Sequence, residues 1–170
     1  VFGSLWLLRG DEASRARSGL SLAVLKIICL DWTHIVTDSG TEDSLQASWL
    51  DDPKALGSLA TEWRDLAIRT SAEVYLTPAW ILVWLRHFMQ DRGFACLVLR
   101  KNGRLVGLLP FCLDHLWVGP IRLRVARFAG TDPHCIIFRL PVEQEVLDEA
   151  LDHSVKHLIR ALRCDVISFT

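Results

Sequence analysis

The sequence has no apolar run long enough to cross a membrane as a helix. Its longest apolar stretch near the N-terminus, Leu20 to Leu30, is interrupted by Lys26 and has about half of the roughly 20 residues that a membrane-spanning helix needs. A stretch of that length is typical of a buried strand, and we predict a strand there. No membrane span is expected.

The chain also lacks an excess of charge of one sign. Its 19 Lys and Arg residues are matched by 20 Asp and Glu residues, which gives a formal net charge of −1. A nearly neutral chain has no whole-surface attraction to nucleic acid or to anionic lipid, although its net charge does not exclude local patches of positive charge. We therefore expect no nucleic-acid partner.

Cysteine pairs at metal-binding or redox spacing are missing as well. The 5 cysteines are an odd number and lie far apart, at Cys29, Cys96, Cys112, Cys135 and Cys164. Most are flanked by Leu, Ile or Val, which predicts buried free thiols in a reducing compartment. We expect a cytoplasmic protein without a structural zinc site or a thioredoxin-like motif.

Several catalytic motifs are absent. Neither Gly-x-Ser-x-Gly nor Gly-x-x-x-x-Gly-Lys-Ser/Thr occurs, so the hydrolase and P-loop classes lack their motifs. His153 and His157 have the i, i+4 spacing of a two-histidine metal pair, but no Glu stands at the metalloprotease position and no third ligand is evident. We predict a solvent-facing pair and no metal.

The 170 residues, 51% hydrophobic and 23% charged, are enough for one domain with a full core. Residues 1–19 show no settled period, which predicts a poorly structured N-terminal segment followed by a single module over 20–170. A strand begins at about Asp165 and the sequence stops soon after, which indicates a fragment truncated at its C-terminal end. Such a fragment is expected to expose faces meant for another module.

The centre of that module is the stretch from Phe94 to Leu113. Two apolar runs meet at Asn102-Gly103, a dipeptide that favours a type I′ hairpin turn. Neither run alternates apolar with polar residues, which indicates strands covered on both faces. We predict a hairpin inside a sheet that has helices on both sides.

Residues that commonly begin helices, together with the spacing of apolar residues, predict the other helices and strands. Asp52-Pro53 and Thr77-Pro78 each indicate the start of a helix, and alternation from Ile121 to Ala126 indicates a half-exposed strand. A strand over Cys135 to Leu140 and a long helix opened by Pro141 follow. The predicted fold class is α/β (α+β), with a mixed, largely antiparallel sheet flanked by helices on both faces.

Four phrases in this order resemble one known family. They are EWRDLA (Glu62 to Ala67), LTPAWILVW (Leu76 to Trp84), RLVGLLPF (Arg104 to Phe111) and RFAGTD (Arg127 to Asp132). Together, over about Leu20 to Phe169, they resemble the amino-terminal half of the GNAT-type acetyltransferases of the CelD-like group, which is associated with cellulose and exopolysaccharide biosynthesis. The resemblance implies a GNAT-like sheet.

The resemblance also implies part of an N-acyltransferase that moves an acyl group from acetyl-CoA, or another acyl-CoA, to an amino group of a small-molecule or sugar-linked acceptor. A second GNAT-like module of the same full-length chain would carry the CoA loop, Gln/Arg-x-x-Gly-x-Gly/Ala, which opens a helix. The nearest match here offers Arg127 and Gly130 as cofactor-binding candidates. Asp132 replaces the second small residue and would repel phosphate, so this fragment alone is expected to be inactive.

Acyl transfer to an amine also needs a base. Asp132 and His134 lie beside a predicted loop and are the catalytic candidates, with a turn-capping Asp and an exposed His as the alternative. Trp80 and Trp84 lie one helical turn apart. Their rings could line the bottom of a substrate groove, or they could belong to the hydrophobic core.

Two further interpretations of the sequence are an anion-binding site and a non-enzymatic role. Arg122, Arg124 and Arg127 could gather an anionic group. Arg122 and Arg124 share a strand face whereas Arg127 has the opposite parity, so a solvated edge is the alternative. The chain could also be a non-catalytic GNAT-like binding or assembly module.

Overall fold

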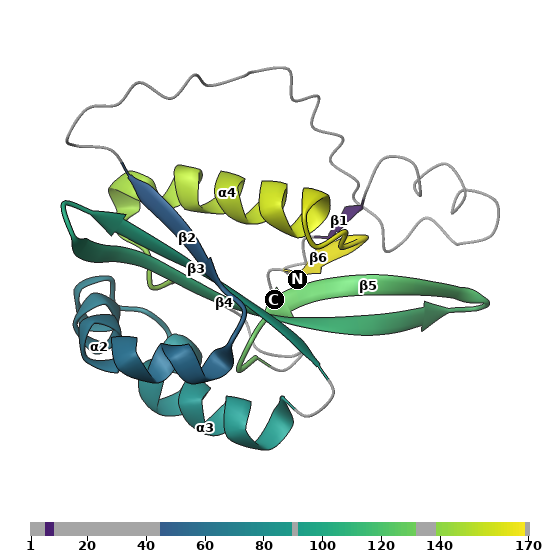
Figure 1. Cartoon of the computed structure of the whole chain (residues 1–170), viewed down its shortest axis with the longest axis horizontal. Helices are drawn as coiled ribbons and strands as arrows, with labels where there is room; N and C mark the ends of the chain where they lie inside the picture. Colours follow the sequence, from purple (N-terminus) through teal and green to yellow (C-terminus); the bar gives the residue numbers. More distant parts are fainter. Residues whose placement is uncertain (1–5, 9–44, 90–91, 132–138, 169–170) are drawn as a thin grey trace.

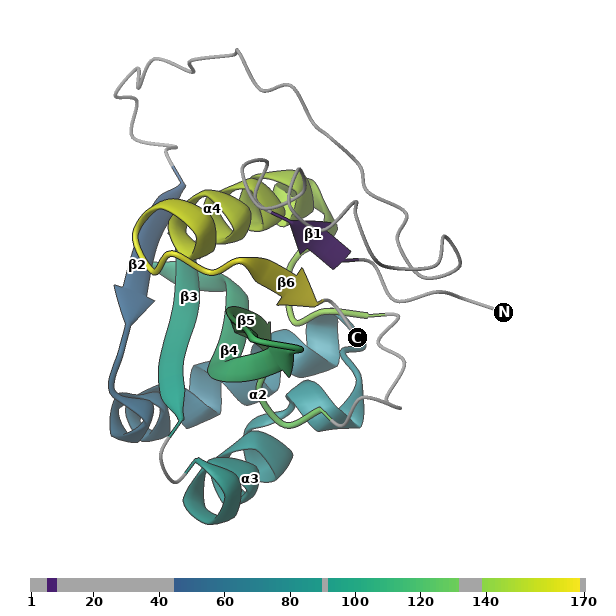
Figure 2. The ribbon, with the colours of Figure 1, turned by 90° about the vertical axis from the view of Figure 1, so that its right-hand side faces the viewer.

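The structure is a computed structural model, and it describes residues 6–8, 45–89, 92–131 and 139–168. One six-stranded sheet has the strand order β1-β6-β5-β4-β3-β2. Helix α4 covers one face of it, and α2 and α3 cover the other, as Figure 1 and the turned view in Figure 2 show. The predicted fold class is therefore confirmed.

The strands are β1 (Trp6–Leu8), β2 (Gln46–Leu50), β3 (Gly93–Lys101), β4 (Arg104–Val118), β5 (Ile121–Phe128) and β6 (Val166–Ser168). The α-helices are α2 (Ala60–Arg69), α3 (Pro78–Phe88) and α4 (Leu147–Arg160), with 3-10 turns η2 (Pro53–Leu59), η3 (Val74–Leu76) and η4 (Gln144–Val146). Neighbouring strands are antiparallel except β5 and β6, which are parallel and joined through α4. No helix in the described ranges is long and apolar enough to cross a membrane.

The predicted hairpin is confirmed as β3 and β4. Asn102 and Gly103 both have positive φ, at 52° and 76°, as a type I′ turn requires. From Phe94 to Leu99 every residue of β3 is buried, and so is every residue of β4 from Leu105 to Leu113. The continuous burial arises because helices lie on both faces of the sheet.

The two helix starts at proline are confirmed with one difference. Asp52 accepts a hydrogen bond from the backbone N–H of Lys54, at 2.9 Å, but the chain first forms a seven-residue 3-10 turn and becomes α-helical at Ala60. Helix α3 begins at Pro78 as predicted and buries Pro78, Ile81 and Leu85. The core-facing stripe of α3 therefore has the expected helical spacing.

Pro141 does not open a helix, and that prediction is wrong. The backbone N–H of Leu108 donates to the carbonyl of Pro141 at 2.9 Å, and that of Glu143 donates to the carbonyl of Val106 at 2.8 Å. Residues 139–143, which we call the strap, thus add an extended stretch along β4, where β5 no longer pairs with it. Helix α4 starts only at Leu147, after η4.

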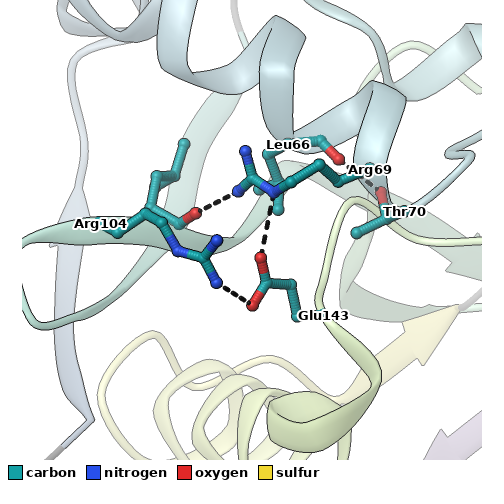
Figure 3. A network of polar contacts seen from close by, with 6 residues as sticks. Leu66, Arg69, Thr70, Arg104 and Glu143 are labelled. Atoms are coloured by element: carbon teal, nitrogen blue, oxygen red, sulfur yellow. Dashed lines mark hydrogen bonds and ion pairs between the residues drawn. The ribbon is translucent and has the colours of Figure 1, made fainter.

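A bridging carboxylate fixes the strap (Figure 3). Glu143 accepts from the Arg69 Nε at 3.2 Å and from the Arg104 Nη2 at 2.9 Å, and Arg69 also donates to the carbonyl of Leu105. The strap is therefore tied to both α2 and β4.

Other sequence predictions fall on residues outside the described ranges. These are the strand over Leu20 to Leu30, positions 135–138 of the predicted strand, Cys29 and Cys135. Arg139 and Leu140, the last two residues of that predicted strand, are described and are not in a strand. Within the segment 1–19, Trp6–Leu8 pairs with β6 as β1.

The described cysteines are buried free thiols, as predicted. Burial raises the pKa of Cys96, and burial followed by the charge of Asp114 raises that of Cys112. Burial also raises the pKa of Cys164 to about 11. None of these three thiols is therefore ionised near neutral pH.

We expect these thiols to react slowly with a disulfide reagent while the chain is folded. At pH 8 each should be at least about a hundredfold slower than the same residue in guanidinium, because the thiolate is the nucleophile. Peptide mapping after timed labelling measures this site by site. The rate at Cys164 should rise as the pH approaches 11, and fast labelling of Cys96 in the native chain would contradict the described packing.

Candidate functional site

The predicted cofactor candidate Arg127 lies on β5 and forms an ion pair across the sheet. Its guanidinium donates to a carboxylate oxygen of Asp114 on β4, from Nε at 2.9 Å and also from Nη2. Burial lowers the pKa of Arg127, but the hydrogen bond and the charge of Asp114 outweigh this and raise it. Arg127 is charged and already has a carboxylate partner.

Asp114 has a second arginine. Arg92, just before β3, places its Nε 3.2 Å from the other carboxylate oxygen, and its guanidinium carbon lies 5.9 Å from the ring centroid of Trp84. Both oxygens of Asp114 are thus occupied, and the three charged groups leave one positive charge in excess. A carboxylate held in this way accepts hydrogen bonds rather than removing protons.

Gly130, the second cofactor candidate, sits in a tight place after β5. Its φ is +82°, and a Cβ built on it would lie 2.3 Å from the Cδ1 of Ile81 and 2.9 Å from the carbonyl oxygen of Tyr75. The Nε1 of Trp80 donates to the Gly130 carbonyl at 2.8 Å. The backbone here packs against the start of α3.

The catalytic candidates Asp132 and His134 lie outside the described residues. The last described residue before them, Thr131, is buried, and its hydroxyl donates to the carbonyl of Phe128 at 2.8 Å. On the far side, the backbone N–H of Glu73 donates to the carbonyl of Arg139 at 3.1 Å. One flank of the segment is therefore tied to the end of β5, and the other to Glu73, just before η3.

The two tryptophans of α3 have different environments. Trp84 is half-buried, packs against the core and lies 5.8 Å from the ring of Phe88. Trp80 is 43% exposed, and its ring lies edge-on to that of Tyr75 with the ring centroids 5.4 Å apart. Its Nε1–H donates to the carbonyl of Gly130. The surface beside the Gly130 turn is therefore aromatic, with Phe88 and Val83 exposed further along α3.

The expectation of a solvent-facing His153 and His157 pair is wrong for one member. His153 is exposed, but His157 stacks on Trp49 of β2 with ring centroids 4.0 Å apart, and burial lowers its pKa. The stacking arises because α4 lies across the sheet with this residue turned inward. In the part of the chain that the structure describes, no group of three His, Cys, Asp or Glu residues could hold a metal.

A cavity of about 460 Å³ lies by the turn between β3 and β4. Its lining is Lys101, Asn102, Arg104, Val106, Glu143, Glu145 and Val146. The lining carries charges of both signs, with the basic residues near the β3–β4 turn and the acidic ones at residues 143 and 145, and Glu143 is the carboxylate that fixes the strap. We assign it no ligand.

Sequence reasoning missed the cluster of Arg92, Asp114 and Arg127. The sequence feature that could have indicated it is Asp114, a single carboxylate after the apolar run from Leu105 to Leu113. Arg92 and Arg127 stand on the segments predicted to lie beside that run. The register that places Arg127 diagonally across from Asp114, opposite Cys112, depends on the turn at Gly119. Periodicity along one strand cannot supply it.

Removing the charge of Asp114 should destabilise the fold. We expect Asp114→Asn to lower the free energy of unfolding by about 1 to 3 kcal/mol, because two partly buried guanidinium groups lose their anion. Urea denaturation measures it. Asp65→Asn, at an exposed position of α2, is the matched control and should change stability by less than about 0.5 kcal/mol; equal losses in both variants would contradict the cluster.

Comparisons with known proteins gave no matching family model, no matching curated protein and no matching solved structure.

Proposed function

We propose that this chain is a GNAT-like module of an acyl-CoA N-acyltransferase that forms one wall of the acceptor site and does not hold the CoA pyrophosphate itself. Two things support the proposal: the ordered resemblance of four phrases to the CelD-like group, and a mixed sheet with helices on both faces. The acceptor is an amine on a small molecule or a sugar-linked carrier, and the location is cytoplasmic.

The geometry of Gly130 supports the proposal that this chain does not hold the CoA pyrophosphate itself. A pyrophosphate-binding loop needs free backbone N–H groups, room for oxygen atoms, and a helix that starts at the loop. Here Ile81 and the Tyr75 carbonyl fill the space beside Gly130, and Trp80 holds its carbonyl. The next helical turn among the described residues begins at Gln144.

In the reaction, the acceptor nitrogen attacks the thioester carbonyl, and a C–N bond forms as the C–S bond breaks. A base takes one proton from that nitrogen, and this proton passes to the departing sulfur, so that CoA leaves as the thiol. Asp132 and His134 are the proposed bases. Trp80, 43% exposed, and the half-buried Trp84 form the proposed wall of the acceptor site. Arg92, 35% exposed next to Trp84, adds a positive charge to that wall.

The test uses the complete gene product with acetyl-CoA and a panel of primary amines, and it follows CoA thiol release. We expect release that depends on the amine. Asp132→Asn or His134→Gln should lower kcat by about a hundredfold or more with unchanged affinity for acetyl-CoA, because general-base catalysis contributes that much. Amine-independent release, or no release with any amine, would contradict the proposal.

The second candidate function is a non-catalytic binding or assembly module. The observation that favours it is the apolar outer surface of α3, where Val83 is 54% exposed and Phe88 58% exposed. Val83→Ser combined with Phe88→Ser would then abolish association with a partner and leave any acyltransferase activity unchanged. Loss of activity without loss of association would favour the enzyme.

A further inference from the structure

The hairpin of β4 and β5 extends beyond the rest of the sheet. β3 stops pairing with β4 at Leu113, and β6 pairs with β5 only over Val125–Arg127. Residues 115–124, which we call the arm, pair with each other. Only at the base of the arm does another segment join, where the Arg124 carbonyl accepts from the Asp165 N–H at 2.8 Å and the Arg124 N–H donates to the Asp165 carboxylate at 2.7 Å. Figure 1 shows this end of β4 and β5 projecting past the helices, and Figure 2 views the molecule from that side.

The tip of the arm is entirely apolar. Residues 116–121 read Leu-Trp-Val-Gly-Pro-Ile, with no polar side chain. Leu116 is 43% exposed, Trp117 65% and Ile121 42%. None of these three is part of the hydrophobic core of the described residues. Apolar surface gathered at the end of a projection gains free energy only when something else covers it.

The two faces of the arm differ. The pairs Leu116 with Leu123 and Val118 with Ile121 make one face aliphatic. On the other face Trp117 pairs with Arg122, and His115 pairs with Arg124. The sequence has no carboxylate from His115 to Thr131, so the arm carries only positive formal charge. Two carboxylates lie at the base of the arm: Asp114 on β4 is held by its two arginines, and Asp165 accepts from the backbone N–H of Arg124 at 2.7 Å.

We propose that the arm inserts its tip into the surface of a membrane that contains anionic lipid. Trp favours the boundary between lipid headgroups and acyl chains, and aliphatic residues favour the acyl chains. From the tip to the pair of His115 and Arg124 is about three residues, or roughly 10 Å of strand. That distance matches the ~5–10 Å to which interfacial segments enter a bilayer, and it leaves the arginines at headgroup level.

Charge complementarity selects the membrane over a second copy of the chain. Two arms that packed along their length would bring the positive charges of one copy close to those of the other, and like charges repel. Anionic headgroups accept hydrogen bonds from the guanidinium group of the exposed Arg122 and attract the positive charge of the half-buried Arg124. The net charge of −1 over the chain does not oppose this, because the attraction is local. The proposal stands independently of acyl transfer.

Vesicle cosedimentation with the 170-residue chain tests it. The vesicles are pure phosphatidylcholine or an equal mixture of phosphatidylcholine and phosphatidylserine. We expect binding to the mixture that weakens with salt. Arg122→Gln with Arg124→Gln should lower the partition coefficient by about 25-fold, because each basic residue near an anionic surface contributes about a fivefold factor. Leu116→Ser with Ile121→Ser should lower it by at least about tenfold.

Ile68→Ser is the matched control, since Ile68 is 71% exposed on α2 and is distant in sequence from the arm. It should bind the mixed vesicles as the unchanged chain does, and circular dichroism checks that every variant is folded. Absence of binding to the mixture, equal binding to pure phosphatidylcholine, or an equal loss in Ile68→Ser would each overturn the proposal. Self-association that the tip substitutions abolish, without vesicle binding, would assign the arm to contacts between copies instead.

Discussion

Gly130→Ala is expected to lower the free energy of unfolding by about 2 to 5 kcal/mol, from positive-φ strain together with overpacking. The alanine would need a φ of +82°, and its Cβ would lie 2.3 Å from the Cδ1 of Ile81 and 2.9 Å from a backbone oxygen of Tyr75. The side chain of Ile81 can turn away, whereas the backbone oxygen cannot without moving η3. Guanidinium denaturation measures the loss.

Gly119→Ala separates the two causes. Gly119 also has a positive φ, at +60°, but nothing lies within 4 Å of the added Cβ. This variant should lose only the strain contribution, about 1 kcal/mol. Equal losses at the two glycines would show that the turn at Gly130 does not press on α3, and the argument against a pyrophosphate at this loop would fail with it.

Trp63→Ala should be the largest loss of core packing, about 3 to 5 kcal/mol. Trp63 on α2 is fully buried, and its Nε1 donates to the carbonyl of Leu76 at 3.0 Å. The indole therefore joins α2 to η3, next to the start of α3. Thermal or chemical unfolding measures the loss.

Two further variants show how much of the loss in Trp63→Ala comes from the hydrogen bond and how much from apolar packing. Trp63→Phe keeps most of the apolar contact but leaves the Leu76 carbonyl without its donor, so we expect about 1 to 3 kcal/mol. Trp117→Ala, at a tryptophan 65% exposed, should change stability by less than about 0.5 kcal/mol. A large loss in Trp117→Ala would show that the arm packs on the molecule rather than projecting from it.

The parts of the fold that follow from local sequence were predictable. Asn102-Gly103 dictates its turn by backbone conformation, and the unbroken apolar runs beside it indicate a strand pair covered on both faces. Pro78 begins α3 because its ring fixes φ and its missing N–H costs nothing at that position. Each of these signals acts within a few residues.

Pro141 shows where local signals fail. It stands in the same kind of sequence as Pro53 and Pro78, yet it lies in the extended strap because β4 offers open hydrogen-bonding groups where β5 has ended. His157 was misjudged for a similar reason, since its environment depends on Trp49, more than a hundred residues away. Long-range pairing decided both cases.

The candidate site was predictable only in its surroundings. The sequence placed Gly130 after a strand and Trp80 at a helix start, but the hydrogen bond that joins them closes fifty residues of chain. The charged cluster around Asp114 likewise needs the register of β4 and β5. Positive φ at Gly130 was foreseeable, whereas the neighbours that fill the space beside it were not.

The most direct test of the central claim is calorimetric titration of acetyl-CoA into two samples, the 170-residue chain and the complete gene product. The account predicts saturable binding to the complete product and no heat of binding with the chain alone, because the turn at Gly130 packs against Ile81, Tyr75 and Trp80. Saturable binding to the chain alone would contradict the assignment of CoA to another part of the protein, and no binding to either sample would contradict acyl transfer altogether.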